Sequence, residues 1–307
     1  MTTDASEENV LQVIRTVKGN HARGHFNQRE IDVIAQEVMP AYQDAGTVGI
    51  ITPYRLQAAE LNQTLGLDIA STVHKYQGRE CETIIMSMVD NEPTEFSDDA
   101  NLLNVAISRA KKHLCIVTNG NEMEPDSNLA QLIAYIQYNN FDVKESKLHS
   151  VFDLLYKQYT TERLNYESTH SSVSEHLSEN LIYHALQKAI EQSPMTNTDI
   201  LCHYPLSRLI SDWELLDEQE KAFAESPLSH VDFLLYNTLT KQPRLAIEVD
   251  GWKFHKESEA QQSRDQLKDQ VLAKCGLRLK RISTTDTINE DNASTLVFAL
   301  QPLQRHL

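Results

Sequence analysis

The sequence contains few cysteines and no long uncharged apolar run. Its four cysteines, Cys81, Cys115, Cys202 and Cys275, are widely spaced and form no CxxC pair. This spacing argues against a zinc site and a disulfide framework, and it is typical of a reducing cytosol. No apolar segment is long enough to span a bilayer, and the acidic N-terminus lacks the apolar core of a signal peptide. We therefore expect a cytoplasmic protein with no membrane partner.

A phosphate-binding loop is also missing. The pattern GxxxxGK(S/T) does not occur, and no predicted strand ends in the paired acids that hold Mg²⁺ in nucleotide-hydrolysing motors. Basic residues are in the minority, since 28 Lys and Arg against 44 Asp and Glu give a net charge of −16. That charge disfavours non-specific coating of nucleic acid. Residues 264–281 differ, with six basic side chains against two acidic ones, and they form either a phosphate-contacting or a plain solvated face.

Short apolar runs alternate with amphipathic segments in the first part of the chain. The 307 residues suit two domains of ordinary size. Strands are predicted at 48–52, 69–73, 83–89 and 114–118, and helices at 27–39, 55–65 and 101–112. Strands that alternate with helices predict an α/β fold with a parallel sheet and helices on both faces. Residues 1–25 give only weak signals.

Three motifs in this part are more specific than the periodicity. Residues 72–80 read TVHKYQGRE, residues 103–111 read LNVAISRAK, and residues 49–55 read GIITPYR. The first two resemble motifs V and VI of superfamily 1 helicases, and the third resembles the strand and turn that precede them in the Upf-like branch. The resemblance covers about residues 20–120. It implies the second RecA-like domain of such a motor, and we expect that domain to lack its opening strand.

This resemblance implies roles at a nucleotide cleft. Arg109 would be the arginine finger, which places a fixed positive charge on the γ-phosphate during hydrolysis. A plain surface arginine on a helix is the alternative. The cleft would also contain Gln77, Gly78 and Glu80.

The resemblance also implies partners. Thr72 and His74 would lie near a nucleic-acid backbone. Because the phosphate loop is missing, ATP is a cofactor only if a P-loop-containing first RecA-like domain is supplied in cis or in trans. The chain alone should therefore not hydrolyse ATP, and we interpret it as the C-terminal part of a longer helicase or as one half of a split one.

Carboxylates interrupt two apolar runs in the second part of the chain. Glu248 stands in the middle of the run 245–251, LAIEVDG, where a buried charge needs a cation or several hydrogen bonds. Asp250 follows two residues later, so both would face one side of a strand that continues that far. Asp232 lies near the start of the run 231–236. Adjacent strands that bring Asp232 beside Glu248 would form an all-oxygen site suited to Mg²⁺ or Mn²⁺.

The order of elements here is informative as well. The prediction is a helix, three strands, a helix and a strand, at 177–190, 200–206, 231–236, 245–251, 261–275 and 278–282. This order resembles the core of the PD-(D/E)xK nuclease fold. The sequence IEVDG, with His255 and the pair Arg264-Asp265 downstream, resembles the Vsr-like branch found fused to bacterial helicases. The resemblance covers about residues 176–285.

The nuclease resemblance implies a metal site. Asp232 and Glu248 would be its ligands, with the Val249 carbonyl as a possible third. Glu179 would complete the site from the preceding helix. A first-turn acid favoured by the helix dipole is the simpler interpretation of Glu179.

The positive group of this site is left open. The usual pattern has a lysine where this chain has Asp250, and Asp250 before Gly251 also suits ordinary turn chemistry. Lys253, His255 and Lys268 are the candidates for the positive group, with Lys268 reaching over from a helix. His255 is alternatively a general base, or simply an exposed or packed histidine.

We therefore predict four segments and two competing functions. The segments are a partial second RecA-like domain at 1–120, a helical connector and linker at 121–175, a PD-(D/E)xK nuclease-like domain at 176–285, and a C-terminal helix or tail at 286–307. Within the connector, helices are expected at 129–138 and 148–159 and an exposed loop at 162–174. The first function is a Mg²⁺- or Mn²⁺-dependent endonuclease acting on DNA, with RNA left open. The second is a catalytically inactive module of a split helicase that binds nucleic acid or docks on a partner.

Overall fold

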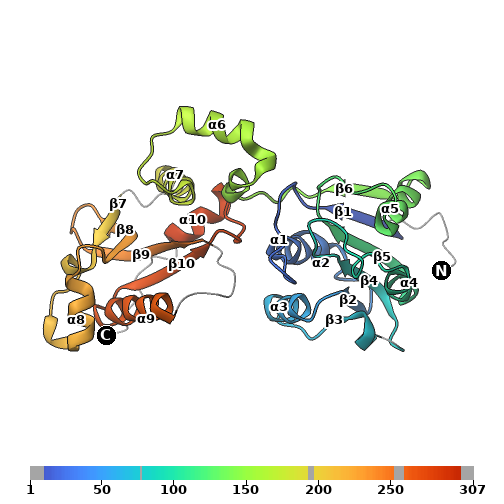
Figure 1. Ribbon diagram of the computed structural model, residues 1–307, viewed down its shortest axis with the longest axis horizontal. Helices are drawn as coiled ribbons and strands as arrows, with labels where there is room; N and C mark the ends of the chain where they lie inside the picture. The colour runs from blue at the N-terminus through green and yellow to red at the C-terminus, as the bar shows by residue number, and fades with distance from the viewer. Residues whose placement is uncertain (1–9, 77, 193–196, 252–258, 299–307) are drawn as a thin grey trace. The chain divides into compact units, whose positions relative to one another are not determined.

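The computed structural model describes residues 10–76, 78–192, 197–251 and 259–298. The chain divides into two compact units (Figure 1). The first is Met1–His149 with Tyr156–Gln158, and the second is Ser150–Leu155 with Tyr159–Leu307. Among the described residues, no helix is both long enough and apolar enough to cross a membrane.

A six-stranded parallel sheet organises the first unit. Its strand order is β3-β2-β4-β5-β1-β6. The strands are β1 (Leu11–Arg15), β2 (Val48–Thr52), β3 (Ala70–Thr72), β4 (Cys81–Ser87), β5 (Ala110–Thr118) and β6 (Asp142–Glu145). Strands covered on both faces need apolar residues on both, and Ile84, Ile85 and Met86 of β4 are all buried. The predicted α/β class, with a RecA-like parallel sheet, is confirmed.

The strand β1 corrects the expectation that the opening strand is missing. It lies between β5 and β6, with Val13 level with Ile116 on one side and Val143 on the other. Val13 packs into the core on one face of the sheet and Ile14 into the core on the other. The sequence signal is weak because β1 has only five residues and a polar side chain, Gln12, interrupts its apolar run.

Helices cover both faces of this sheet. They are α1 (Gln28–Val33), which continues through a π-helical turn (Ile34–Val38) into α2 (Met39–Ala41), then α3 (Arg55–Leu65), α4 (Ala100–Ser108) and α5 (Asn128–Tyr138). Apolar residues of α1 and α3 pack on one face, and those of α4 and α5 on the other. The helix α3 has the predicted bounds and ends at Gly66, whose φ of 64° is left-handed. The helix α4 ends earlier than predicted, because Ala110 already belongs to β5.

Two of the motifs pack on each other through a glycine. Gly49 of β2 lies beneath the ring of Tyr76, which ends a 3₁₀ turn (Val73–Tyr76) after β3. A Cβ at position 49 would come within 1.9 Å of the Tyr76 hydroxyl. That hydroxyl donates to the Ile69 carbonyl at 3.3 Å. The glycine of GIITPYR is therefore explained by the close approach of the tyrosine of TVHKYQGRE.

A buried polar network joins α1, α3 and the end of β4. The Asn27 side chain caps α1 by accepting from the Glu30 N–H at 3.2 Å. The Glu30 carboxyl group, which is fully buried, accepts from the Ser87 hydroxyl at 2.7 Å and from the Val89 N–H at 3.0 and 3.1 Å. Gln57 donates to the same hydroxyl at 2.9 Å. Burial raises the pKa of Glu30 to about 8, although the hydrogen bonds from Ser87 and Val89 oppose this rise.

This raised pKa predicts that the first unit loses stability with rising pH. Unfolded Glu30 ionises near its ordinary value of 4.5, whereas folded Glu30 stays protonated up to about pH 8. Within that window the folded state binds the extra proton, so the free energy of unfolding falls by about 1.4 kcal/mol per pH unit from this group alone. Urea unfolding between pH 5 and 8 should show a shallower pH dependence for Glu30→Gln than for wild type. Identical slopes would contradict the assignment.

A four-stranded mixed sheet organises the second unit. Its order is β10-β9-β8-β7, with β8 antiparallel to both β7 and β9, and β10 parallel to β9. The strands are β7 (Thr198–Pro205), β8 (His230–Asn237), β9 (Pro243–Asp250) and β10 (Arg278–Ser283). The crossover from β9 to β10 runs through α9 (Glu259–Lys274). Together with α7 (Leu177–Gln192) before β7, these elements follow the predicted order of helix, three strands, helix and strand.

Two cores lie on opposite faces of this sheet. One contains Leu181 of α7 and Phe233 of β8 together with Val297 of α10 (Glu290–Phe298). The other contains Val271 of α9 and Ala224 of α8 (Glu218–Glu225). The C-terminal segment expected at 286–307 therefore contributes a packed helix, α10, to the second unit.

The connector expected at 121–175 is divided between the two units. The helix α5 packs on the first sheet, whereas residues 150–155 and α6 (Thr160–Thr169) belong to the second unit. The helix expected at 148–159 is instead two 3₁₀ turns, Val151–Leu155 and Lys157–Tyr159. Phe152 anchors the first of these turns because its side chain is buried in the second unit's core. The expected loop at 162–174 is wrong in its first half, which is α6.

Candidate functional site

Asp232 and Glu248 lie side by side where β8 and β9 separate. The last paired residues of these strands at this end are Phe233 and Ile247. Beyond this pair, the main-chain N–H groups donate to side-chain carboxylates instead of to carbonyls of the neighbouring strand. Glu248 accepts a hydrogen bond from the Asp232 N–H at 3.2 Å, and Asp232 accepts one from the Val249 N–H at 2.8 Å. The parting of the strands therefore creates two backbone donors, and the two carboxylates satisfy them.

Of the three candidates for the positive group, Lys268 contacts this pair. Its ammonium group lies 2.6 Å from the Glu248 carboxylate, and the two side chains are only 15% and 8% exposed. The lysine reaches across from α9, whose apolar residue Val271 holds the helix against the sheet. The other two candidates, Lys253 and His255, lie outside the described residues.

The pKa values of the two carboxyl groups are raised. Burial raises the pKa of Glu248 to about 7, repulsion from Asp232 adds to the rise, and Lys268 opposes it. Burial also raises the pKa of Asp232, and the charge of Glu179 contributes to the rise. The hydrogen bond from Val249 and the charges of Lys268 and His230 oppose it. A further cation beside these two carboxyl groups would favour their charged forms.

Glu179 lies in the first turn of α7. Its side chain is 11% exposed, and its carboxylate lies 2.9 Å from Nε2 of His203. Its charge contributes to the raised pKa of Asp232. Glu179 therefore has a hydrogen-bond partner and an effect on Asp232, in addition to its place in the first turn of α7.

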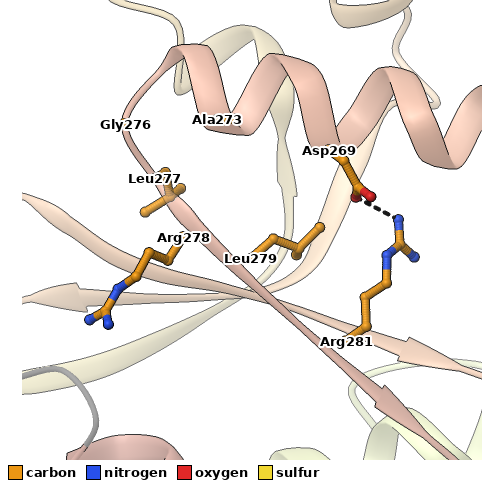
Figure 2. Close-up of a pocket in the computed structure, with 7 residues that line it drawn as sticks. All are labelled: Asp269, Ala273, Gly276, Leu277, Arg278, Leu279 and Arg281. Carbon is orange, nitrogen blue, oxygen red and sulfur yellow. Dashed lines mark hydrogen bonds and ion pairs between the residues drawn. The ribbon is translucent and has the colours of Figure 1, made fainter.

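Asp250 forms an ion pair with Arg281. Both of its carboxylate oxygens lie 3.2 Å from Arg281, which also binds Asp269 at 2.9 Å and Asp265 at 3.6 Å. Figure 2 shows Arg281 reaching Asp269 beside a hollow between α9 and β10, while Arg278 extends the other way. The register explains the contact, because Arg281 stands level with Glu248, two residues before the pair of Ser283 and Asp250 and on the same side of the sheet as Asp250.

Half of the basic side chains in the stretch 264–281 are paired with acidic residues of the second unit. Lys268 pairs with Glu248, Lys274 with Glu220 at 2.6 Å, and Arg281 with its three aspartates. Three of the six basic side chains are thus committed within the second unit. The stretch is not a uniform phosphate-binding face.

The donor set of the carboxylate pair suits a hard divalent cation. Among the described residues, no three His, Cys, Asp or Glu side chains gather closely enough to hold a metal ion. Mg²⁺ does not require three, because it keeps several waters and is commonly held by one or two carboxylates. Two buried, mutually repelling carboxylates therefore fit the ion, and ligation by the Val249 carbonyl stays a prediction.

A second candidate site lies where β4 and β5 begin in the first unit. Arg109 caps the C-terminus of α4, and its carbonyl accepts from the Cys81 N–H at 3.1 Å. This contact brings Glu80 next to Arg109. The Arg109 side chain bonds to the Val105 carbonyl and the Ser108 hydroxyl of its own helix, and it forms no ion pair with a described carboxylate. Glu80 pairs instead with Lys111 at 3.4 Å.

The remaining predicted residues of this unit are placed as follows. Gly78 has a left-handed φ of 81° in the loop before β4. Thr72 ends β3, and His74 is exposed on the 3₁₀ turn that follows. Gln77 lies outside the described residues. A half-buried guanidinium without a carboxylate partner is the kind of group that can meet a phosphate.

Comparison with known proteins separates the two units. Residues 5–121 match a family described as an AAA domain. The DNA polymerase alpha-associated DNA helicase A of Schizosaccharomyces pombe is 31% identical over 128 residues, which are 39% of this chain and 19% of that protein. An uncharacterized ATP-dependent helicase of Methanocaldococcus jannaschii is 30% identical over 122 residues, 38% of this chain and 18% of that protein. The first unit is similar to the C-terminal part of superfamily 1 helicases.

The helicase-like unit is only part of such a protein. The chain spans about a fifth of the length of these relatives. The DNA-binding protein SMUBP-2 of Rattus norvegicus is 31% identical over 115 residues, 35% of this chain and 12% of that protein. A solved C-terminal domain of a possible DNA helicase from Lactobacillus plantarum covers 45% of this chain and 86% of its own, at 14% identity and a TM-score of 0.31, too low to inform the fold. Residues 176–299 match a family described only as a protein of unknown function, DUF2726.

Sequence reasoning found the carboxylates of the second unit and missed three of their partners. His203, His230 and Arg281 belong to no motif that the sequence displays. The nearest signal is the strand period of β10, which puts Arg281 on the side that faces α9. Nothing in the sequence around His203 indicates its contact with Glu179.

Proposed function

We propose that this chain is a metal-dependent DNA endonuclease domain joined to the second RecA-like domain of a superfamily 1 helicase. The observation that carries the proposal is the buried Asp232–Glu248 pair with Lys268 at 2.6 Å from Glu248. The order of helix, three strands, helix and strand supports it, because it is the order expected for a PD-(D/E)xK nuclease. The DNA in the names of two relatives supports DNA as the substrate, and RNA stays open.

Each residue of the second unit has a distinct task in this proposal. Asp232 and Glu248 would hold Mg²⁺ or Mn²⁺. When bound, such an ion orients a water molecule and stabilises charge on the transferring phosphate. Lys268 fixes the Glu248 carboxylate and presents a positive charge to a phosphate oxygen. Glu179 adds a third carboxylate from α7 that faces Asp232.

The helicase-like unit would supply one side of an ATP site. Arg109 would stabilise charge on the γ-phosphate, and Gly78 and Glu80 would line the cleft with Gln77. The first RecA-like domain would come from another segment or another chain. In the absence of that first RecA-like domain, this chain would bind nucleic acid but would not hydrolyse ATP.

A catalytically inactive binding module is the second candidate. Asp250 favours it, because it stands where the usual pattern has lysine and its charge is taken up by Arg281. The buried Lys268 opposes it, because a charge at the Glu248 carboxylate replaces the missing lysine.

Lys268→Gln tests the proposal against a matched control. We expect this change to lower nicking of plasmid DNA by the full chain by about a hundredfold or more, because it removes the charge next to the reacting phosphate. Lys274→Gln is the control, since Lys274 also lies on α9 and makes an ion pair of 2.6 Å, but with Glu220. It should melt at a lower temperature and nick at the wild-type rate. Equal loss in both variants, or in neither, contradicts the role of Lys268.

A further inference from the structure

We propose that His203 is a positioning residue that holds the Glu179 carboxylate toward the Asp232–Glu248 pair. The inference rests on the proposed nuclease function and extends it by one residue. Three features of β7 and α7 support it: the register of β7 with β8, the φ angle of His203, and the hydrogen bond between His203 and Glu179.

His203 stands opposite Asp232 in the sheet. On either side of it, Cys202 pairs with Phe233 and Tyr204 pairs with Val231, so position 203 falls level with 232. The N–H of Asp232 donates a hydrogen bond to the Glu248 carboxylate. The irregular part of β7 thus lies directly across from the irregular part of β8.

The backbone of His203 is in a conformation that costs free energy. Its φ of 48° is left-handed, which is uncommon for any residue other than glycine, although histidine adopts it more often than most. At this point the side chains of β7 and β8 switch from one face of the sheet to the other. Cys202 and Phe233 pack in the core with α7, whereas Tyr204 and Val231 pack in the core with α8 and α9. The left-handed residue is therefore the point at which β7 turns, and the turn directs its side chain to α7.

The His203 ring contacts one residue of α7 and one residue of β8. Its Nε2 lies 2.9 Å from Glu179, and because a carboxylate only accepts hydrogen bonds, Nε2 is the donor. Its ring also meets the edge of His230, at 5.3 Å between centroids. No second hydrogen bond reaches the Glu179 side chain from the described part of the chain. The orientation of Glu179 therefore depends on His203.

A positioning role differs in its consequences from plain stabilisation. If His203 only satisfied a buried carboxylate, its loss would lower the melting temperature and leave the metal dependence of cleavage unchanged. If it aims Glu179, its loss should lower the cleavage rate and weaken the response to metal even at temperatures where the protein is fully folded.

The test compares His203→Gly with His203→Gln in the full chain. Glycine accepts the left-handed backbone without strain and removes the donor, whereas glutamine keeps an N–H donor at similar reach. We expect His203→Gly to lower plasmid nicking at saturating Mn²⁺ by about tenfold or more, and to raise by a similar factor the Mn²⁺ concentration that gives half of the thermal stabilisation. His203→Gln should recover most of both losses.

A double variant ties the effect to Glu179. Because His203 acts through that carboxylate, His203→Gly should cause no further loss of nicking in a Glu179→Ala background. Two results would overturn the inference and leave the proposed nuclease function intact. One is a double variant whose loss of nicking is the product of the two single losses, and the other is a His203→Gly variant that matches wild type in nicking and in Mn²⁺ response. A wild-type chain that neither nicks DNA nor responds to Mn²⁺ overturns the proposed function and this inference together.

Discussion

Asp232→Asn should remove most of the stabilisation that Mg²⁺ or Mn²⁺ gives to the wild-type chain. Two buried carboxylates repel each other, and burial with this repulsion raises the pKa of Glu248 to about 7. A cation between them relieves the repulsion and should stabilise the folded chain by about 2.7 kcal/mol at a hundredfold excess over its dissociation constant. Thermal melting with and without the metal measures this gain in each variant.

The asparagine variant should remain folded. Its side-chain oxygen can still accept the hydrogen bond that Asp232 takes from the Val249 N–H at 2.8 Å. The loss of one negative charge also removes the electrostatic repulsion between Asp232 and Glu248. Asp250→Asn is the control, because Asp250 is bound to Arg281 at 3.2 Å and is 43% exposed. A metal response that survives in Asp232→Asn, or vanishes equally in Asp250→Asn, would contradict the assignment of the pair.

Arg109→Ala should abolish ATP turnover in a reconstituted motor. The chain alone is expected to show no ATPase activity, because it has no phosphate loop. Addition of a P-loop-containing first RecA-like domain should restore turnover. Loss of the arginine finger should then lower the rate by about 10³-fold or more, since a fixed charge on the γ-phosphate is removed.

Lys112→Ala is the matched control for that experiment. Lys112 stands near Arg109 at the start of β5, but its ammonium group is paired with Glu82 at 2.9 Å. Its removal should leave turnover close to the wild-type level. ATPase activity of the isolated chain that disappears in Arg109→Ala would contradict the view that this is half of a motor, because it would require a complete site within these 307 residues.

The periodicity of apolar residues predicted most helices and strands, because residues close in sequence determine where these elements begin and end. The helix α3 begins and ends as expected, since an amphipathic run meets Gly66, which provides the left-handed cap. The strand β1 was missed because Gln12 breaks its apolar run and its neighbours β5 and β6 are distant in sequence. Parallel partners of this kind leave no local turn signal. The end of α4 was misplaced because pairing with β4 overrides helix propensity from Ala110 onward.

The candidate site was predictable only where neighbours in space are also neighbours in sequence. Asp232 and Glu248 lie on strands joined by a short turn, so two neighbouring apolar runs that both contain a carboxylate were enough to bring them together. Lys268 stood among three candidates because its reach depends on how α9 lies on the sheet. His203 was not predictable, since its left-handed backbone and its contact with Glu179 arise from packing between α7 and β7.

The central claim is that the second unit cuts DNA with a divalent cation held by Asp232 and Glu248. The most direct measurement is the conversion of supercoiled plasmid to nicked circles by the purified full chain, with Mg²⁺, with Mn²⁺ and with EDTA, beside the Asp232→Asn variant. The account predicts nicking by the wild-type chain that requires metal and that Asp232→Asn does not show. Absence of nicking by the wild-type chain with either metal, or equal nicking by Asp232→Asn, would contradict it and favour the inactive binding module.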